Sequence, residues 1–438
     1  MSPDADTSTA APDGEGWLAL TVLALLAGAT SGFVASLFRL ALDRGDQWRD
    51  AVIGWAHGRS LLGFLVVVAG AAGAAAVAAW LVRRFAPYAG GSGIPHVEAV
   101  VNAELPPAPV VLVPVKFLGG WLAIGAGLAL GREGPSVQMG AGLSWLLGKA
   151  CRLRERDCLA LLAAGAGTGL ATAFNAPVAG AVFVLEELVR RFDPRIAIAA
   201  LAASGAGIAV AWLLIGQRPD FRVEVTSYPA FASVPLFLVL GLVAGLAGAA
   251  YNAALLLTLS AADRLDRWPL ELRASVIGAG VGVVAWLAPG LVGGGDALTQ
   301  RVLSGAASLA WLPLAFLLRF VLGAASYAAG TPGGLFAPML VLGAQLGLLF
   351  GSVASQPFSD PRMPATAFAV VGMAAFFTAV VRAPLTGIVL ITEMTAGLTL
   401  LLPMLLACSM AMLVPTVLSN APIYDSLRER TVHAGRRT

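Results

Sequence analysis

The sequence contains long stretches without a single charged residue, and no other feature constrains the fold as strongly. A segment of roughly 20 apolar residues can cross the hydrocarbon core of a bilayer as a helix. Two longer charge-free windows, 225–262 and 320–359, are each expected to hold two elements or a re-entrant pair. Four windows have the length of a single span: 17–38, 61–82, 196–217 and 274–295.

Composition also indicates a protein that lies mostly within the membrane. Hydrophobic residues make up 58% of the chain and charged residues 12%, and the mean hydropathy is +0.82. Soluble domains carry about 25% charged residues. The 51 glycines and 26 prolines indicate many short or interrupted helices that pack closely through small residues. We therefore expect an all-α polytopic membrane protein.

Two stretches of the chain recur in its second half. PSVQMGAGLSWLLG, from Pro135, aligns with PMLVLGAQLGLLFG, from Pro338. APVAGAVFVLEE, from Ala176, aligns with APLTGIVLITEM, from Ala383, at nearly the same separation. Chance similarity in a chain rich in Ala, Gly and Leu is the alternative explanation. Duplicated membrane folds are often inverted repeats with their binding site near the midplane, and we expect that arrangement.

The repeat and the charge distribution define the expected boundaries. We predict membrane repeats at 17–217 and 225–424, with the polar loop 216–229 between the halves. Residues 1–16 and 425–438 are expected to be cytoplasmic tails, without a C-terminal regulatory domain. Basic residues cluster in CRLRER, VRRFDPR and the C-terminal RERTVHAGRR. The positive-inside rule places such clusters in the cytoplasm, so both termini are expected there.

Several classes of function lack support in the sequence. The N-terminus is acidic and has no basic region, which argues against a cleavable signal peptide. Cys151, Cys158 and Cys408 form no CxxC pair, so neither a metal site nor a disulfide framework is expected. No Lys/Arg run is interleaved with aromatic residues, which argues against nucleic-acid binding.

Three segments combine glycines with a proline in the way that begins a helix at membrane depth. They are GGSGIP (90–95), GREGP (131–135) and GTPGGLFAP (330–338). Glycine lets the backbone turn sharply, and proline suits the first helical turn. A helix start presents unpaired N–H groups and about half a positive charge, which together attract an anion. We predict one dehydrated anion held by backbone dipoles and the Ser92 hydroxyl, weakly enough for the ion to leave again.

Glu133, in GREGP, is an ionisable residue inside an apolar region. A carboxylate in a first helical turn can simply be stabilised by the helix dipole. Intramembrane ionisable residues are costly, however, and are functional by default. A carboxylate beside an anion site can itself occupy that site and must leave it when protonated. Glu133 is therefore predicted to be both a gate and a proton carrier.

In these motifs the sequence resembles the CLC family of chloride channels and proton-coupled transporters. The order of GSGIPHVEAV, KFLGG, GREGPSVQMG, FNAPVAG, VLEEL, GGLFAP, APLTGIVLITEMT and APIY is that of the family, over roughly residues 20–425. The resemblance implies an antiparallel inverted repeat of about 18 tilted, partly re-entrant helices (the CLC fold). It also implies a homodimer with one pore per subunit, most plausibly in a bacterial inner membrane.

The resemblance also implies roles for individual residues. Ser92 and Tyr424 would donate hydroxyls to a central chloride, and Glu133 would be the outer gate. Glu98 and Lys116 match a buried pair of opposite charges with a supporting role. Backbone N–H groups would come from Gly334, Leu335 and Phe336, and the motif residues expected to support the site are Gly93, Pro95, Arg132, Gly134 and Pro135.

The family contains passive channels and exchangers that move two chlorides for one proton. Exchangers commonly carry an inner acid at the second glutamate of VLEEL, which is Glu187. A helix-end carboxylate paired with a nearby arginine is the alternative for this residue. A 2:1 chloride/proton exchanger without a cofactor is the expected function, and a passive chloride channel is the alternative.

Two positions refine this expectation. His96 stands where bacterial relatives usually carry an acid, so it could tune the pH response, although a satisfied polar histidine is the simpler reading. Fluoride-selective relatives usually lack the serine at position 92, and plant nitrate exchangers place proline there. Ser92 therefore favours chloride.

Two other classes remain as rivals. GGSG (90–93) also reads as the serine motif of an intramembrane protease, which requires a histidine to take the proton of the serine. The three histidines, His57, His96 and His433, are poorly placed for that, and no HExxH motif is present. A cation or amino-acid symporter would want carboxylates or carbonyls around its site, whereas these motifs offer helix N-termini and hydroxyls.

Overall fold

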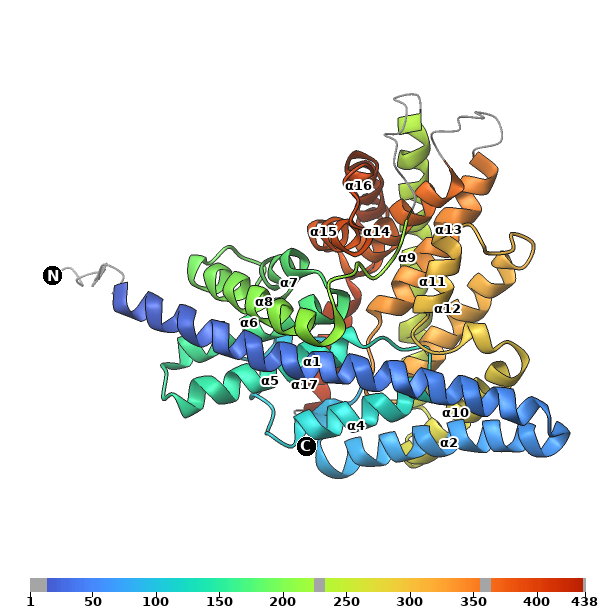
Figure 1. The fold of residues 1–438 in the computed structure, drawn as a ribbon, viewed down its shortest axis with the longest axis horizontal. Helices are drawn as coiled ribbons and strands as arrows, with labels where there is room; N and C mark the ends of the chain where they lie inside the picture. The colour runs from blue at the N-terminus through green and yellow to red at the C-terminus, as the bar shows by residue number, and fades with distance from the viewer. Residues whose placement is uncertain (1–13, 224–232, 355–363, 436–438) are drawn as a thin grey trace.

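The computed structural model describes residues 14–223, 233–354 and 364–435 and is entirely helical within them (Figure 1). These residues form seventeen α-helices and no β-strand, close to the number expected. The helices of the first half are α1 (Gly14–His57), α2 (Ser60–Phe85), α3 (Ile94–Val101), α4 (Leu112–Gly125), α5 (Glu133–Ala150), α6 (Glu155–Phe174), α7 (Pro177–Phe183) and α8 (Pro194–Ile215). Those of the second half are α9 (Val234–Asp263), α10 (Leu270–Leu287), α11 (Asp296–Leu303), α12 (Leu312–Ala328), α13 (Phe336–Ala354), α14 (Ala365–Val381), α15 (Pro384–Thr395), α16 (Leu401–Val417) and α17 (Ile423–Gly435).

Seven of these helices are long and apolar enough to cross a membrane. Helices α1, α2, α8 and α10 coincide with the four single-span windows, although α1 continues to His57. The window 320–359 holds the end of α12, an irregular segment and α13, as predicted up to residue 354. The prediction of two elements in 225–262 is wrong for its described part, because α9 is one unbroken helix from Val234.

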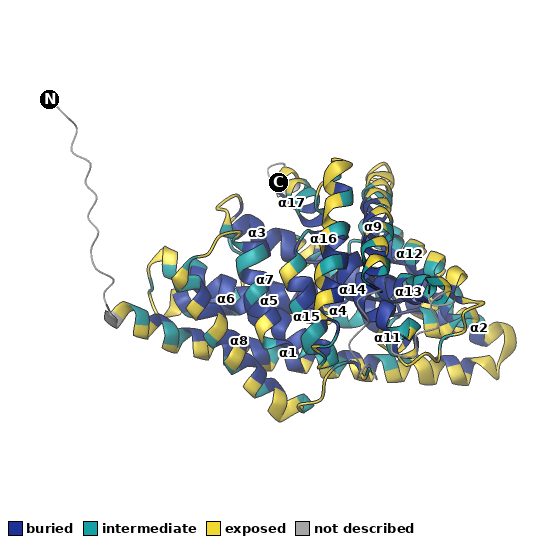
Figure 2. Ribbon diagram, turned by 90° about the horizontal axis from the view of Figure 1, so that it is seen from above, coloured by how far each residue is buried: buried dark blue, intermediate teal, exposed yellow. Residues whose placement is uncertain are grey.

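The helices form a buried centre inside a shell of apolar surface. Figure 2 shows α5, α6 and α14 almost wholly buried, whereas α1, α2 and α8 carry exposed residues along their outer faces. Many of the exposed side chains are large and apolar, including Leu213 at 86% and Leu257 at 70% exposure. An exposed apolar surface of this extent fits contact with lipid rather than with water.

Helices α5 and α6 pack closely through glycines, and α13 and α14 repeat that arrangement. A Cβ atom added at Gly140 would lie 2.3 Å from the carbonyl oxygen of Gly165. One added at Gly343 would lie 2.5 Å from the carbonyl oxygen of Gly372. Both contacts require glycine, because a methyl group would force the helix backbones apart.

Helices α7 and α15 cap each other, which relates the two halves directly. The Glu393 carboxylate accepts hydrogen bonds from the N–H groups of Val178 (3.1 Å) and Ala179 (2.8 Å) at the start of α7. Glu186, at the matching position in the first half, accepts bonds from Leu385 (3.0 Å) and Thr386 (2.6 Å) at the start of α15. Two helices can cap each other in this way only if they run antiparallel, as an inverted repeat requires.

The C-terminal segment differs from a simple tail. Residues from Ile423 to Gly435 form α17, which packs against α3. Tyr424 is therefore at the start of a helix, and the segment expected to begin a tail at residue 425 continues that helix. Its cytoplasmic location stays a prediction.

Candidate anion-transport site

The three glycine–proline segments meet at the centre of the molecule. Gly131 and Gly334 exchange backbone hydrogen bonds of 2.8 and 2.7 Å, which join the segments before α5 and α13. Gly91, before α3, donates to the carbonyl of Thr331 at 3.0 Å and accepts from the N–H of Gly333 at 3.0 Å. Helices α3, α5 and α13 consequently begin beside one another, and their N-terminal dipoles act on one place.

The Glu133 carboxylate lies at the N-terminus of α13. Its side chain is 1% exposed, and Oε2 accepts a long hydrogen bond of 3.4 Å from the N–H of Ala337. A Cβ atom at Gly131 would lie 2.0 Å from Oε2, so the glycine leaves the space that the carboxylate fills. A negatively charged group thus occupies the kind of helix start at which the sequence predicts an anion.

Ser92 and Tyr424 present two buried hydroxyls at the same centre. Both residues are 0% exposed, and within the part of the chain that the structure describes neither the Ser92 Oγ nor the Tyr424 hydroxyl has a partner that meets hydrogen-bond geometry. A Cβ atom at Gly134 would lie 2.5 Å from the Ser92 Oγ, which places this hydroxyl beside the first turn of α5. The Tyr424 ring stacks at 6.0 Å on that of Phe336. Buried hydroxyls are almost always hydrogen-bonded, so two without partners are suited to an acceptor such as an anion.

The backbone at the start of α13 agrees with prediction only in part. The N–H of Gly334, expected to face an anion, donates to the carbonyl of Gly131 in this structure, and its role at the anion site stays a prediction. The N–H groups of Leu335 and Phe336 have no partner of this kind within the described chain. Phe336 is fixed by the rings of Phe377 (4.7 Å), Phe183 (5.8 Å) and Phe174 (6.1 Å).

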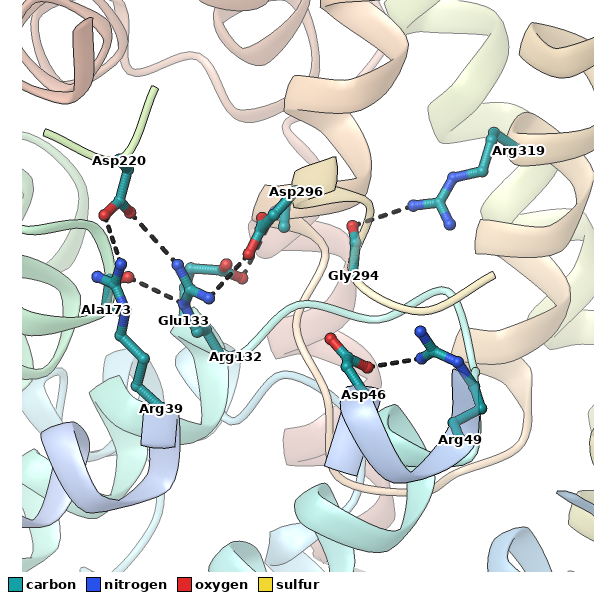
Figure 3. A network of polar contacts seen from close by, with 11 residues as sticks. Arg39, Asp46, Arg49, Arg132, Glu133, Ala173, Asp220, Gly294, Asp296 and Arg319 are labelled. Atoms are coloured by element: carbon teal, nitrogen blue, oxygen red, sulfur yellow. Dashed lines mark hydrogen bonds and ion pairs between the residues drawn. The ribbon is translucent and has the colours of Figure 1, made fainter. Parts of the chain in front are cut away.

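Arg132 binds carboxylates from two other parts of the chain (Figure 3). Its guanidinium lies 2.8 Å from Asp296 at the start of α11 and 3.3 Å from Asp220, and it donates to the carbonyl of Ala173 at 3.0 Å. Asp220 also pairs with Arg39 of α1 at 2.6 Å. Two carboxylates offset the charge of Arg132, so it supports the motif rather than acting as a free cation for chloride. No local sequence feature near Arg132 indicates these partners.

A cavity of about 120 Å³ adjoins this network and reaches Glu133. Both Arg132 and Glu133 line it. The other charged residues in its wall are Asp43, Asp46, Arg49, Asp50 and Asp296.

The supporting residues of the motifs lie where close packing requires them. Gly93 has φ +85°, in the left-handed region that favours glycine, and an added Cβ would lie 2.3 Å from the Gln138 side chain. A Cβ at Gly134 would lie 2.5 Å from the carbonyl of Ser92. Pro95 and Pro135 stand in the first turns of α3 and α5, as expected for proline.

Glu98 and Lys116 do not form the pair that the resemblance implied, although both are 0% exposed. Lys116 donates to the carbonyls of Ala89 (3.0 Å) and Gly91 (2.8 Å) and so holds the segment before Ser92. Glu98 lies 3.1 Å from Arg190 instead. The correction has a simple cause, because the ammonium reaches backbone carbonyls at a loop while the carboxylate faces the other end of α3.

Glu187 is buried just beyond the C-terminal end of α7. It lies in a π-helical turn, Val184–Leu188, which extends α7, and its side chain is 3% exposed. Its Oε1 is 3.4 Å from Arg190, whose backbone φ is +53°. The pairing with a nearby arginine, given above as the alternative for this residue, is therefore present. The relay role stays a prediction.

The histidines show no serine-protease geometry. The His96 ring lies tilted by 33° against the Tyr88 ring at 4.6 Å, and its Nε2 has no hydrogen-bond partner within the described chain. His57 contacts the carbonyl of Trp286, and His433 that of Glu429. Among the described residues, no group of three or more His, Cys, Asp or Glu side chains could hold a metal ion.

Comparison with known proteins points to one family. A family profile described as voltage gated chloride channel matches residues 72–416. The chain is 37% identical over 419 residues to the H(+)/Cl(-) exchange transporter ClcA of Vibrio parahaemolyticus, covering 94% of this chain and 89% of that protein. It is 36% identical over 423 residues to ClcA of Yersinia pseudotuberculosis, covering 94% and 88%.

Solved structures give the same picture. The structure of a slow cyanobacterial Cl-/H+ antiporter superposes with a TM-score of 0.89 at 31% identity, covering 94% of this chain and 98% of that chain. A eukaryotic CLC transporter superposes with a TM-score of 0.79 at 22% identity, covering 94% and 74%, and at that identity it shows the fold alone.

Proposed function

The chain belongs to the voltage-gated chloride channel (CLC) family, and we propose that it exchanges chloride for protons across a membrane. One observation carries this proposal: the Glu133 carboxylate lies at the start of α13, beside two buried hydroxyls that have no partner among the described residues. A titratable anion in an anion site links proton binding to anion binding. The exchange transporters to which the chain is similar agree with this function.

The gate follows from competition between two anions for one helix start. In its charged form, Glu133 accepts the hydrogen bond from Ala337 and excludes chloride from that position. A proton on the carboxylate removes the charge and weakens its attraction to the α13 dipole. Chloride then takes the position that the carboxylate leaves, and the side chain carries the proton away with it.

The central site is proposed to hold chloride with weak neutral donors. The hydroxyls of Ser92 and Tyr424 and the N–H groups of Leu335 and Phe336 are the candidates. Arg132 is offset by Asp220 and Asp296, so no free positive charge traps the ion. Binding of this strength lets chloride both enter and leave, as transport requires.

Glu187 is proposed to supply protons from the other side of the membrane. It is buried but lies beside Arg190, whose side chain is 39% exposed, so a proton has a short route from the surface. The positive-inside rule makes the side of the membrane near Glu187 the cytoplasmic one, because the basic segment VRRFDPR begins two residues after Glu187. A proton would pass between Glu187 and Glu133 once for every two chlorides.

The remaining features of the proposal concern the setting of the protein. The apolar surface supports an integral, multi-pass membrane protein. We place it in a bacterial inner membrane as a homodimer with one pore per subunit and both termini cytoplasmic. The cycle uses chloride and protons alone and needs no cofactor. A protease is disfavoured because, in the described parts of the chain, no histidine hydrogen-bonds the Ser92 hydroxyl and Nε2 of His96 has no partner.

Purified protein in liposomes tests the proposal. An imposed chloride gradient should drive protons uphill in the opposite direction, which external pH reports at once. Proton movement that stops when chloride is replaced by an impermeant anion would establish coupling. Chloride flux without any uphill proton movement would show a passive channel instead.

A further inference from the structure

Five charged side chains, the proposed relay Glu187 among them, lie between α3, which follows Ser92, and α17, which carries Tyr424. We call them the Arg190 cluster: Glu98, Glu187, Arg190, Asp425 and Arg428. Glu98 belongs to α3, Glu187 to the π-helical turn, and Arg190 to the loop after it. Asp425 and Arg428 lie in the first two turns of α17, which packs against α3 (Figure 2).

Arg190 faces three carboxylates with one nitrogen atom. Its Nη2 lies 2.7 Å from Asp425, 3.1 Å from Glu98 and 3.4 Å from Glu187. That nitrogen carries only two hydrogens, so the three carboxylates compete for it. The arginine backbone is held in the left-handed region at φ +53°, and its Nε donates to the carbonyl of Glu187 at 3.2 Å.

The competing carboxylates stand on the elements that position the anion site. Asp425 directly follows Tyr424, and Glu98 is on α3, which begins two residues after Ser92. Arg428 adds a second connection between these helices, 3.6 Å from Glu98 and 3.9 Å from Asp425. Glu104, 3.7 Å from Arg428, is the remaining charged group that faces the cluster.

We propose that Arg190 is a positioning residue that couples the protonation of Glu187 to the position of Tyr424. The inference rests on the proposed exchange and adds the link between its two paths. A proton takes Glu187 from charge −1 to 0 and weakens its hold on Arg190. The guanidinium then binds Asp425 and Glu98 more closely, which moves the start of α17 and the Tyr424 hydroxyl relative to bound chloride.

Such coupling must act in both directions. If protonation of Glu187 changes chloride affinity by some factor, chloride changes the proton affinity of Glu187 by the same factor. Couplings of this kind usually amount to about 5- to 150-fold. The cluster therefore predicts a measurable effect of the charge at Glu187 on chloride binding, although the hydrogen bonds and ion pair of Glu187 among the described residues go to Arg190 and not to the predicted chloride donors.

A double-mutant cycle measured by chloride calorimetry tests the inference. Glu187→Gln imitates the protonated relay and should change chloride affinity by about fivefold or more. Asp425→Asn keeps the shape of the side chain and removes the charge that competes for Arg190. In the Asp425→Asn background, Glu187→Gln should change chloride affinity less than about twofold. If the two mutations only destabilised the protein, Asp425→Asn would not remove the effect of Glu187→Gln on chloride affinity.

Matched variants in the same elements provide the controls. Glu429→Gln removes an exposed carboxylate one turn further along α17, and Arg191→Gln removes the exposed arginine next to Arg190. Both should leave the full effect of Glu187→Gln in place. Arg190→Gln should remove it, and Arg190→Lys should restore part of it, because a positive charge remains.

The outcomes separate this inference from the exchange itself. An equal effect of Glu187→Gln with and without Asp425→Asn, in protein that exchanges chloride for protons, would overturn the coupling alone. Wild-type protein that moves chloride without protons would overturn the exchange, and the calorimetric cycle would still decide whether the cluster transmits charge to the anion site. If the effect of Glu187→Gln on chloride affinity disappears in the Asp425→Asn background but persists in the Glu429→Gln background, the coupling between Glu187 and the anion site is established.

Discussion

Glu133 and Glu187, the proposed outer gate and inner relay, have similar neighbours in sequence but different bonding partners in the structure. Glu133 and Glu187 are both buried, and each has an arginine close by in sequence. At Glu133, the neighbouring Arg132 turns to Asp220 and Asp296, and the carboxylate binds the N–H of Ala337 (Figure 3). At Glu187, the carboxylate pairs with Arg190 itself.

Under the proposed exchange, this difference would let one residue type serve two roles. A carboxylate held by backbone dipoles sits where chloride would sit, so it competes with the ion. A carboxylate held by an arginine is attached to a cation outside the predicted anion path, so it can exchange protons without displacing chloride. In both places the partner of the nearby arginine determines what the glutamate binds: Arg132 binds other carboxylates and leaves Glu133 to the backbone, whereas Arg190 pairs with Glu187.

Removing the outer carboxylate should have the largest effect. Glu133→Gln imitates the protonated gate, and Glu133→Ala deletes it. Both variants should keep chloride flux but abolish proton transport and its pH dependence, because no titratable group remains at α13. In the wild type, flux should rise as external pH falls, since protonation releases the carboxylate. Paired chloride and proton flux assays in liposomes measure this, and proton transport in Glu133→Ala would contradict the gate.

Removing the inner carboxylate should separate the two roles. Glu187→Gln leaves Glu133 able to titrate from outside but cuts its supply of protons from within. We expect proton transport to be lost while chloride flux stays sensitive to external pH. The adjacent Glu186→Gln is an unsuitable control because Glu186 caps α15, so Glu429→Gln on α17 serves instead. Uphill proton transport in Glu187→Gln would show that this glutamate is not the relay.

Local sequence features predicted the centre of the fold well. The beginnings of α3, α5 and α13 follow from glycine and proline chemistry, which depends on a few neighbouring residues. The recurrence of Glu186 at Glu393 also signalled a real relation, since these two side chains cap each other's helices. Charge-free windows found the long helices because the length of a span is a local property.

Pairings between distant residues were beyond local reasoning. Nothing in the sequence near Arg132 indicates that Asp220, in the predicted loop between the halves, would reach it. The expected Glu98–Lys116 pair failed because buried charges take whatever partner the packing brings close. The window 225–262 was misjudged because the absence of charge limits where a helix can lie but does not show where it breaks.

A smaller change tests whether the outer carboxylate needs its exact space. In Gly131→Ala the new methyl would lie 2.0 Å from Oε2 of Glu133, so the flexible side chain must move away from α13. Losing a hydrogen bond to a charged group costs about 1.5–3 kcal/mol. Chloride flux at high external pH should therefore rise by about tenfold or more. Gly142→Ala, whose nearest contact would be an ordinary 3.7 Å, is the control. Unchanged pH dependence in Gly131→Ala would place the working carboxylate elsewhere.

The smallest expected effect concerns Ser92, whose single hydroxyl is predicted to set the choice of ion. Ser92→Pro should shift the selectivity between chloride and nitrate toward nitrate. The expected shift in free energy is on the order of 1 kcal/mol, the usual net value of one hydrogen bond. Proline also removes the backbone N–H that donates to the Tyr327 hydroxyl at 3.3 Å, so two changes occur at once. Ser92→Ala removes the hydroxyl alone, and Tyr327→Phe removes the other bond alone. If the hydroxyl selects the ion, Ser92→Ala should reproduce most of the shift in competition flux assays and Tyr327→Phe little of it. The reverse ranking would assign selectivity to the backbone before α3, and no shift in any variant would remove Ser92 from the site.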